Sequence, residues 1–328
     1  MADKGSPMNI RLLFPSIVFV VSCTKNNETG SISTQMDTAG LSQADPAGLS
    51  EVVPLDLTDA DAMAMAFAKT RGSLNPEEEV IYYWTGLMYN RPRSAPEEFA
   101  GFDYGSPMMR FEGFNIARFE PVSPGVFDMV TREINVYQNL NGDIIDCWYN
   151  GNIGAENPKP VPVVHVQNDP VNFQISGADA VEMGEHIIFP MEVVISYDSP
   201  LPIDDYAIYS AGNTYESTEL FNFYTTRTAL ENPKNNSVPA HISWSRVGQY
   251  LPWMQAGQLD GNLVYHAQGM KLENGWDDLP EHLQDWVLEH APEYRNAPTS
   301  IASTRNMTSW RYFKKLVDEG TYTGSCDQ

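Results

Sequence analysis

Positive charge is scarce in this sequence. The 328 residues include 20 Lys and Arg against 43 Asp and Glu, which gives a net charge of −23, and the basic residues form no cluster. Binding to a phosphate backbone requires concentrated positive charge, so nucleic acid is excluded as a partner. The same deficit disfavours binding to an anionic membrane surface and leaves a covalent lipid anchor as the expected membrane contact.

Cysteine is also rare, and the common metal and cofactor motifs are missing. The three cysteines are Cys23, Cys147 and Cys326, and the sequence has no CxxC, HExxH or Cys/His cluster, so we predict no metal site. It has no GxGxxG motif or P-loop, so we predict no cofactor, and no Gly-x-Ser-x-Gly elbow that would favour covalent hydrolysis. Cys147 and Cys326 could pair in an oxidising compartment, but the second lies close to the C-terminus, and we predict two unpaired thiols.

The apolar run near the N-terminus is too short to cross a membrane. Leu12 to Val21 form an almost wholly apolar stretch of ten residues, whereas a spanning helix needs about twenty. The run ends in Val20-Val21-Ser22-Cys23, which resembles a bacterial lipobox. We therefore predict a signal peptide over residues 1–22, with Met1–Pro7 an artificial addition or a misassigned start, and lipid attachment at Cys23. Ordinary secretion with cleavage near Cys23 is the alternative.

The sequence then divides into a tether and one domain. Residues 23–50 are polar and without periodicity, which is typical of a flexible linker. Residues 51–328 are long enough for a single β-rich domain with a substantial core. Thr24, in place of Asp after the lipidated cysteine, resembles the pattern sorted to an outer membrane. We expect a lipid-anchored protein of the cell envelope, at the periplasmic face of the outer membrane or at the cell surface.

Strands dominate the expected structure. Three helices are predicted: one capped by Thr58 and running to Lys69, one between the cap Asp278 and the stop at Ala291-Pro292, and one over Ser309–Asp318. Strands are predicted at 80–89, 111–119, 131–137, 144–149, 161–166, 187–197, 220–228, 241–247 and 263–271, with a hairpin turn at Asn141-Gly142. So many strands with few helices between them favour a mainly β fold, an antiparallel barrel-like meander with lipocalin-like logic and a few peripheral helices. A two-sheet β-sandwich is the alternative.

Several short segments resemble a known family. They are FEGFNIAR (111–118), HVQNDP (165–170), SWSRV (243–247), LPWM (251–254), LVYHA (263–267), PEYR (292–295) and TSW (308–310). In this order they resemble the domain of unknown function 1838 family, over about residues 55–318. The resemblance implies an exported bacterial or fungal protein and carries over no catalytic residue.

The strand at 111–119 offers the first candidate site. Strand alternation places Glu112, Phe114, Ile116 and Arg118 on one face and Asn115 on the other. A face that mixes an acid and a base with apolar side chains suits a cavity wall, with Glu112 as a catalytic group and Arg118 and Asn115 as ligand-binding groups. A salt bridge that only stabilises the strand is an equal alternative.

The segment 165–170 offers a second candidate. His165 shares a face with Asp169 and could be a general base that the carboxylate orients, while Asn168 could bind ligand. The residues Asn168-Asp169-Pro170 are typical of a strand end and turn, so Asp169 could instead cap that turn, and His165 could be a core histidine.

The strands near the C-terminus offer a third candidate. Trp244 and Arg246 share a face and could hold an aromatic or carboxylated ligand by stacking and bidentate hydrogen bonds; the alternative is a tryptophan core anchor covered by the arginine. Tyr265 is added as a ligand-binding residue and His266 as a catalytic one. His282 and His290 are expected to be solvated. Trp253 and Trp310 are assigned to the core.

Two functions are consistent with these residues. The first is a cofactor-independent lyase or isomerase that moves protons on a small hydrophobic or aromatic metabolite, with Glu112 or His165 as the proton carrier. The second is a carrier protein that binds an apolar ligand at the cell envelope without turnover. Ionisable residues within the strands favour the enzyme slightly, because a carrier of apolar ligands needs fewer of them.

Overall fold

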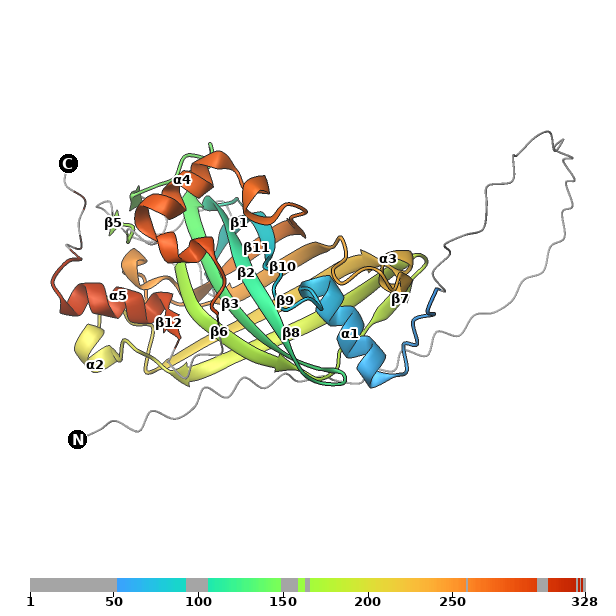
Figure 1. Ribbon diagram of the computed structural model, residues 1–328. Helices are drawn as coiled ribbons and strands as arrows, with labels where there is room; N and C mark the ends of the chain where they lie inside the picture. The colour runs from blue at the N-terminus through green and yellow to red at the C-terminus, as the bar shows by residue number, and fades with distance from the viewer. Residues whose placement is uncertain are drawn as a thin grey trace, which may run out of the picture.

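The fold is built on one large curved sheet. The computed structural model describes residues 52–92, 106–148, 159–162, 166–257, 259–299, 306–322, 324 and 326 (Figure 1). The strands are β1 (Val80–Pro92), β2 (Met109–Ser123), β3 (Val126–Gln138), β4 (Cys147–Trp148), β5 (Lys159–Pro160), β6 (Val166–Ile175), β7 (Val181–Met183), β8 (His186–Asp198), β9 (Thr214–Thr226), β10 (His241–Gly248), β11 (Gly261–Lys271) and β12 (Met307–Thr308). The helices are α1 (Ala60–Arg71), α2 (Ile203–Tyr206), α3 (Arg227–Glu231), α4 (Glu281–His290) and α5 (Ser309–Asp318), with 3-10 turns η3 (Pro252–Met254), η4 (Gly275–Asp278) and η5 (Pro292–Arg295).

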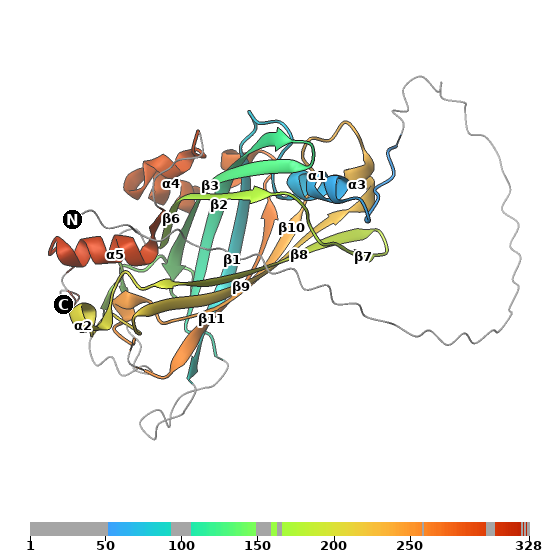
Figure 2. The ribbon, with the colours of Figure 1, turned by 90° about the horizontal axis from the view of Figure 1, so that it is seen from below.

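Ten strands form this sheet, in the order β12-β6-β3-β2-β1-β11-β10-β9-β8-β7. All neighbouring pairs are antiparallel, and the long strands twist and curl the sheet into a half-barrel (Figure 2). The predicted mainly β, antiparallel, barrel-like meander is confirmed. The alternative of a sandwich is not found, because a single sheet supplies both walls of the core. The strands β4 and β5 pair separately.

The two faces of the sheet are covered differently. On the concave face, Phe67 of α1 packs edge-on against Phe223 of β9, with ring centroids 5.6 Å apart. On the convex face of β1–β3, a second core holds Phe114 and Ile134 against Leu283 of α4. In both views α5 and α2 lie at one end of the sheet, and α1, α3 and β7 lie at the other (Figures 1 and 2). The half-barrel is therefore filled from its ends by helices and side chains.

The predicted helices exist, but two of their caps are wrong. Helix α1 is capped by Asp59, whose carboxylate accepts hydrogen bonds from the amides of Asp61 and Ala62, while Thr58 donates to Asp56 instead. Helix α4 begins after Pro280, without a side-chain cap. Helix α5 has the predicted bounds Ser309–Asp318. Carboxylates and hydroxyls that stand close together in sequence compete for the same amides, so the capping residue could not be assigned from sequence.

The strand prediction fails around residues 161–170. The strand is β6, over Val166–Ile175, so the residues 168–170 lie inside a strand and not at a turn. Its pairing with β3 shifts between Thr131 and Glu133, where two residues of β6 oppose Arg132. Such a bulge accommodates Pro170, which has no amide proton to donate. The turn at Asn141-Gly142 exists, with φ of 99° at Gly142, but only one bridge, Gln138 to Ile144, follows it.

The prediction of two unpaired thiols is wrong. Cys147 and Cys326 form a disulfide, with their Cα atoms 6.2 Å apart and a separation of 179 positions in sequence. The C-terminal segment is held in place by further contacts, because the Tyr322 hydroxyl donates to the carbonyl of Pro160 at 3.0 Å. Distance along the chain from the terminus was therefore a poor guide to order.

Candidate functional site

A cavity of about 220 Å³ lies on the concave face of the sheet. Its wall is mainly aromatic, because the inward positions of eight neighbouring strands, from β6 round to β8, carry large rings. Trp244 is stacked on Phe221 at 6.1 Å between ring centroids and meets Phe111 edge-on at 5.7 Å. The aromatic lining consists of Tyr82, Trp84, Phe111, Tyr137, Phe173, Tyr197, Tyr215, Phe221, Phe223, Trp244, Tyr265 and Trp310. Rings of this kind favour a flat apolar or aromatic ligand.

Arg71 brings a buried positive charge to the cavity. It is the last residue of α1 and is 7% exposed. Its Nη2 donates to Oδ1 of Asn115 at 2.5 Å, and its guanidinium lies over the ring of Tyr82 at 5.1 Å. Its Nη1 has no hydrogen-bond partner among the described residues. Burial lowers the pKa of Arg71, yet an arginine stays protonated in proteins, so an incompletely paired cation lines the cavity.

Arg246 is the second cation and is better paired. Its Nε lies 3.2 Å from Oε1 of Glu219, its Nη2 donates to the hydroxyl of Tyr215, and its guanidinium lies over the ring of Tyr265 at 5.0 Å. Burial raises the pKa of the Glu219 carboxyl, and Arg246 opposes that rise by favouring the charged form. The carboxyl and the arginine form a largely internal pair, which leaves Arg71 as the group with spare hydrogen-bonding capacity.

Further polar groups line the cavity between the rings. Burial raises the pKa of the Tyr137 and Tyr265 hydroxyls, so both phenols are protonated at neutral pH. The indole of Trp84 donates to Oδ1 of Asn135 at 2.6 Å. Glu133 also lines the cavity and lies near enough to Arg71 to oppose the fall in its pKa. The site therefore combines an apolar wall with a few fixed donors and acceptors.

Four of the predicted site residues meet in this cavity. Asn115, Trp244, Arg246 and Tyr265 all line it. The predicted pairing of Trp244 with Arg246 on one strand face is confirmed, since both side chains point inward from β10 and are buried. Trp244 also packs in the core, so it is both a core anchor and a residue of the cavity lining. Their roles in binding stay predictions.

Glu112 and Arg118 lie on the opposite face from the cavity. The shared face with Phe114 and Ile116 is confirmed, but that face packs beneath α4 and does not form a cavity wall. Arg118 pairs with Glu79 at 3.0 Å, not with Glu112. The hypothesis that this face lines the cavity is therefore wrong. Alternation fixes which residues share a face, but it does not say which face turns inward.

The partners of Glu112 include an unexpected histidine. The Glu112 carboxylate accepts hydrogen bonds from the hydroxyl of Tyr83 at 2.8 Å and from Nε2 of Gln138 at 2.6 Å. Nε2 of His282 lies 2.5 Å from the same carboxylate. His282 was expected to be solvated, and its side chain is 53% exposed, yet its ring nitrogen reaches this carboxylate. These contacts tie α4 to the convex face of the sheet.

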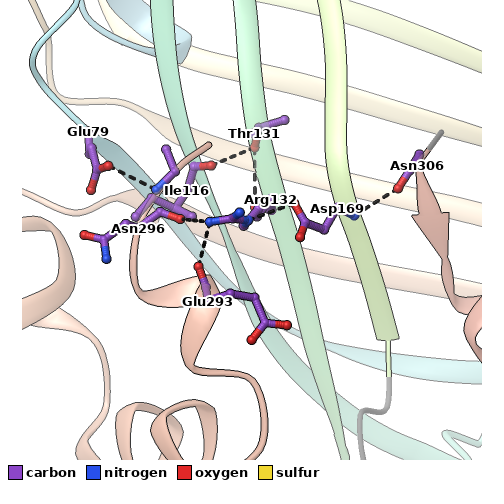
Figure 3. Close-up of polar contacts among 9 residues, drawn as sticks. Glu79, Ile116, Thr131, Arg132, Asp169, Glu293, Asn296 and Asn306 are labelled. Carbon is purple, nitrogen blue, oxygen red and sulfur yellow. Dashed lines mark hydrogen bonds and ion pairs between the residues drawn. The ribbon is translucent and has the colours of Figure 1, made fainter. Parts of the chain in front are cut away.

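Two other predicted catalytic residues, Asp169 and His266, also lie away from the cavity. Asp169 pairs with Nε of Arg132 at 2.8 Å, and the same arginine donates to the backbone carbonyls of Glu293 and Asn296 at 2.7 and 2.8 Å (Figure 3). This arrangement joins β3, β6 and the η5 turn. His266 is exposed on the convex side of β11, next to Gln268. His165 and the side chain of Asn168 lie outside the described residues.

The sequence matches a known protein family over most of its length. The model for the family described as "Protein of unknown function (DUF1838)" matches residues 77–317, which includes every strand of the half-barrel. The chain belongs to the DUF1838 family. The predicted resemblance is thus confirmed. A comparison with curated proteins found no match. The family assignment brings no activity with it, so the function has to be argued from the cavity.

The described part of the DUF1838 domain shows neither a metal-binding cluster nor a membrane-spanning helix. Among the described residues, no group of three or more His, Cys, Asp or Glu side chains could hold a metal ion. No helix in the same part of the chain is long and apolar enough to cross a membrane. The predicted lipidation site Cys23, the predicted signal peptide (1–22) and the predicted tether (23–50) lie outside the described residues.

The sequence analysis missed several residues of the cavity. Arg71 gave only the signal of a basic residue in the last turn of a helix, which is common because cations favour that end of the helix dipole. Glu133 and Tyr137 share the inward face of β3 with Asn135, and Glu219 faces inward from β9. Trp310, which we assigned to the core, lines the cavity from α5. Register with the neighbouring strands would have been needed to find them.

Proposed function

We propose that this DUF1838 protein binds a small aromatic or apolar molecule that carries an anionic group. The observation that carries this proposal is the buried guanidinium of Arg71, whose Nη1 is unpartnered among the described residues on a cavity with an aromatic wall. A buried donor on a charged group is costly to leave unpaired, and a carboxylate is the ligand group that matches a guanidinium best. Asn115 holds the arginine in place from the other side.

The acid and amide forms of one ligand test the charge recognition. Benzoate and benzamide have the same shape, and only the acid carries charge. We expect benzoate to bind more tightly by about 1.5–3 kcal/mol, the usual value for a hydrogen bond to a charged group. Fluorescence titration is suitable, because Trp84, Trp244 and Trp310 all line the cavity.

Two variants locate the effect. Arg71→Gln should remove the preference for the acid, whereas the control Arg118→Gln, on the convex face, should keep it. Equal affinity of the wild type for the two compounds would count against an anionic ligand. A loss of the preference in both variants would show that the effect does not come from the cavity.

A second candidate function is proton-transfer catalysis by a lyase or isomerase without a cofactor. The observation that favours it is Glu219, a half-buried carboxyl whose pKa is raised in the same cavity as two protonated phenols. Such a carboxyl can give a proton to a bound molecule and take one back within a turnover. Glu112, Asp169 and His266 have no part in this version, because they lie away from the cavity. Turnover that survives Glu219→Gln unchanged would rule out this role.

We propose further that the domain acts at the cell envelope, anchored by lipid at Cys23. The Cys147–Cys326 disulfide supports export, because structural disulfides persist in oxidising compartments. In a bacterial host, the wild type should label with palmitate and partition into detergent. Cys23→Ala should lose both properties, and equal labelling of the two proteins would contradict the anchor.

A further inference from the structure

A second, larger hollow lies beside the aromatic cavity. It has a volume of about 460 Å³ and is bordered by the N-terminal half of α1, the residues that follow β6, and the start of β8. Its apolar lining comes mainly from Met63, Phe67, Ile175, Phe189 and Met191. Thr58, Ala60 and Ser176 on its rim are exposed, so it opens to solvent. We call it the α1 groove.

The α1 groove and the aromatic cavity share a wall. Phe173 of β6 and Met191 of β8 line both, and both side chains are only half-buried. A phenylalanine and a methionine at such a position can change rotamer without breaking a hydrogen bond. Methionine in particular adapts to different neighbours.

The sheet leaves this side open. β6 and β8 each lie one strand in from an end of the strand order, next to the short strands β12 and β7, and no ladder joins them in the described residues. The curl of the sheet brings both strands to the same cavity, which Phe173 of β6 and Met191 of β8 line. From β6 round to β8 the wall of the cavity is a continuous hydrogen-bonded sheet, which a ligand could not pass, and Arg71 of α1 and Trp310 of α5 add to the lining.

Helix α1 runs along both spaces. Its first half borders the α1 groove through Ala60, Met63 and Phe67, and its last residue, Arg71, lines the aromatic cavity. A molecule held by its anionic group at Arg71 would therefore have an apolar path along the helix towards solvent. A compact aromatic acid would leave this path unused.

We infer that the ligand is amphipathic, with an aromatic acid as its head and an aliphatic chain as its tail. The head occupies the aromatic cavity, and the tail lies in the α1 groove. The ligand enters between β6 and β8, past Phe173 and Met191. This inference rests on the proposed function and adds the tail and the entry route to it. The wall of two adaptable side chains that the two spaces share, and the cation with an unpaired nitrogen in one of them, favour an amphipathic ligand over a wholly apolar one.

A series of 4-alkylbenzoic acids, from methyl to decyl, tests the inference by calorimetric titration. Burial of each added methylene in the α1 groove should raise the affinity of the wild type roughly fourfold until the groove is filled. Two variants block the groove: Ala178→Trp, at a half-buried lining position, and Gly177→Trp, where an added Cβ meets no atom within 4 Å. Ala180→Trp is the matched control, because Ala180 is half-buried on the same loop and lines neither space.

The outcomes separate the two proposals. We expect both blocking variants to bind the methyl compound like the wild type but to lose the gain from longer chains, while the control keeps that gain. Wild-type affinity that does not rise with chain length would overturn the tail site and leave the proposed function intact. The same holds if neither blocking variant weakens the long acids. If no member of the series binds the wild type, the proposed function fails as well.

Discussion

At the scale of single residues, one glycine makes room for the polar part of the cavity. Gly113 is buried on β2, at a position that faces Asn135 across the β2–β3 pairing. A Cβ at this position would lie 2.2 Å from the carbonyl oxygen of Ile134 and 2.4 Å from Oδ1 of Asn135. Because that same oxygen accepts the hydrogen bond from Trp84, the missing side chain of Gly113 positions two residues of the cavity lining.

We therefore predict that Gly113→Ala lowers the free energy of unfolding by about 1–3 kcal/mol, the usual cost of overpacking. Urea denaturation measures the loss in the free energy of unfolding. The changed position of Trp84 should also alter the near-UV circular dichroism spectrum. Gly177→Ala is the control, since its added Cβ meets nothing within 4 Å. Equal stability of the Gly113→Ala variant and the wild type would show that the β2–β3 pair can relax around the methyl group.

The same scale shows what a sequence can tell about a site. Alternation placed Trp244 with Arg246, and Glu112 with Arg118, and both placements are confirmed. It could not decide that Glu112 and Arg118 face α4, because both faces of β2 are buried and carry polar or charged residues among apolar ones. Arg71 depends on contacts with residues 11 and 44 positions away, Tyr82 and Asn115, which no local pattern reveals.

At the scale of elements, the C-terminal end of α1 meets a half-buried lysine. Nζ of Lys271 donates to the carbonyls of Lys69, Thr70 and Gly72, at 2.8, 3.2 and 2.6 Å. Carbonyls at the C-terminal end of a helix receive no hydrogen bond from an amide of the same helix. The lysine thus joins the end of β11 to the helix that carries Arg71. Burial, with a smaller contribution from Arg71, lowers the pKa of Lys271 to about 7.

This shift predicts a dependence of stability on pH. Between pH 7 and the ordinary lysine pKa of 10.5, the unfolded chain binds the proton more tightly than the folded one. The free energy of unfolding should therefore rise as the pH is raised from 7 to 9.5. Urea denaturation at half-unit intervals measures the slope, and Lys271→Met should have a smaller one. Identical slopes in the two proteins would mean that Lys271 remains charged throughout and is held by its three carbonyls.

The elements differ in how far the sequence could predict them. The bounds of α5 were predicted from its apolar face, with Trp310, Phe313 and Val317 on one side, and from Gly320 after its end, and the structure adds the cap Thr308. The strand β6 was misplaced because Pro170 is typical of a turn, and only its pairing with β3 shows that a bulge accommodates it. The local signals were correct where nothing distant competed with them.

At the scale of the whole molecule, the half-barrel is closed at one end by its own C-terminal segment. Cys147 precedes Trp148, which packs edge-on against Trp253 at 5.6 Å, and Trp253 contacts Tyr137 of the cavity lining at 5.7 Å. The disulfide to Cys326 and the hydrogen bond from Tyr322 to the carbonyl of Trp253 hold the segment there. The order of this end therefore depends on contacts that span more than half of the chain.

The disulfide should contribute strongly to stability, because it joins residues 179 positions apart. A crosslink over so long a loop removes much of the conformational freedom of the unfolded chain, and its loss is expected to cost about 2–5 kcal/mol. The double variant Cys147→Ala/Cys326→Ala should unfold at correspondingly lower urea concentration. Dithiothreitol should shift the wild type to the same midpoint and leave the variant unchanged.

Since neither cysteine lines the cavity, benzoate should bind the folded variant as it binds the wild type. A wild-type midpoint that does not respond to dithiothreitol would contradict a stabilising role, and a variant that folds but no longer binds would show that the C-terminal segment also shapes the cavity.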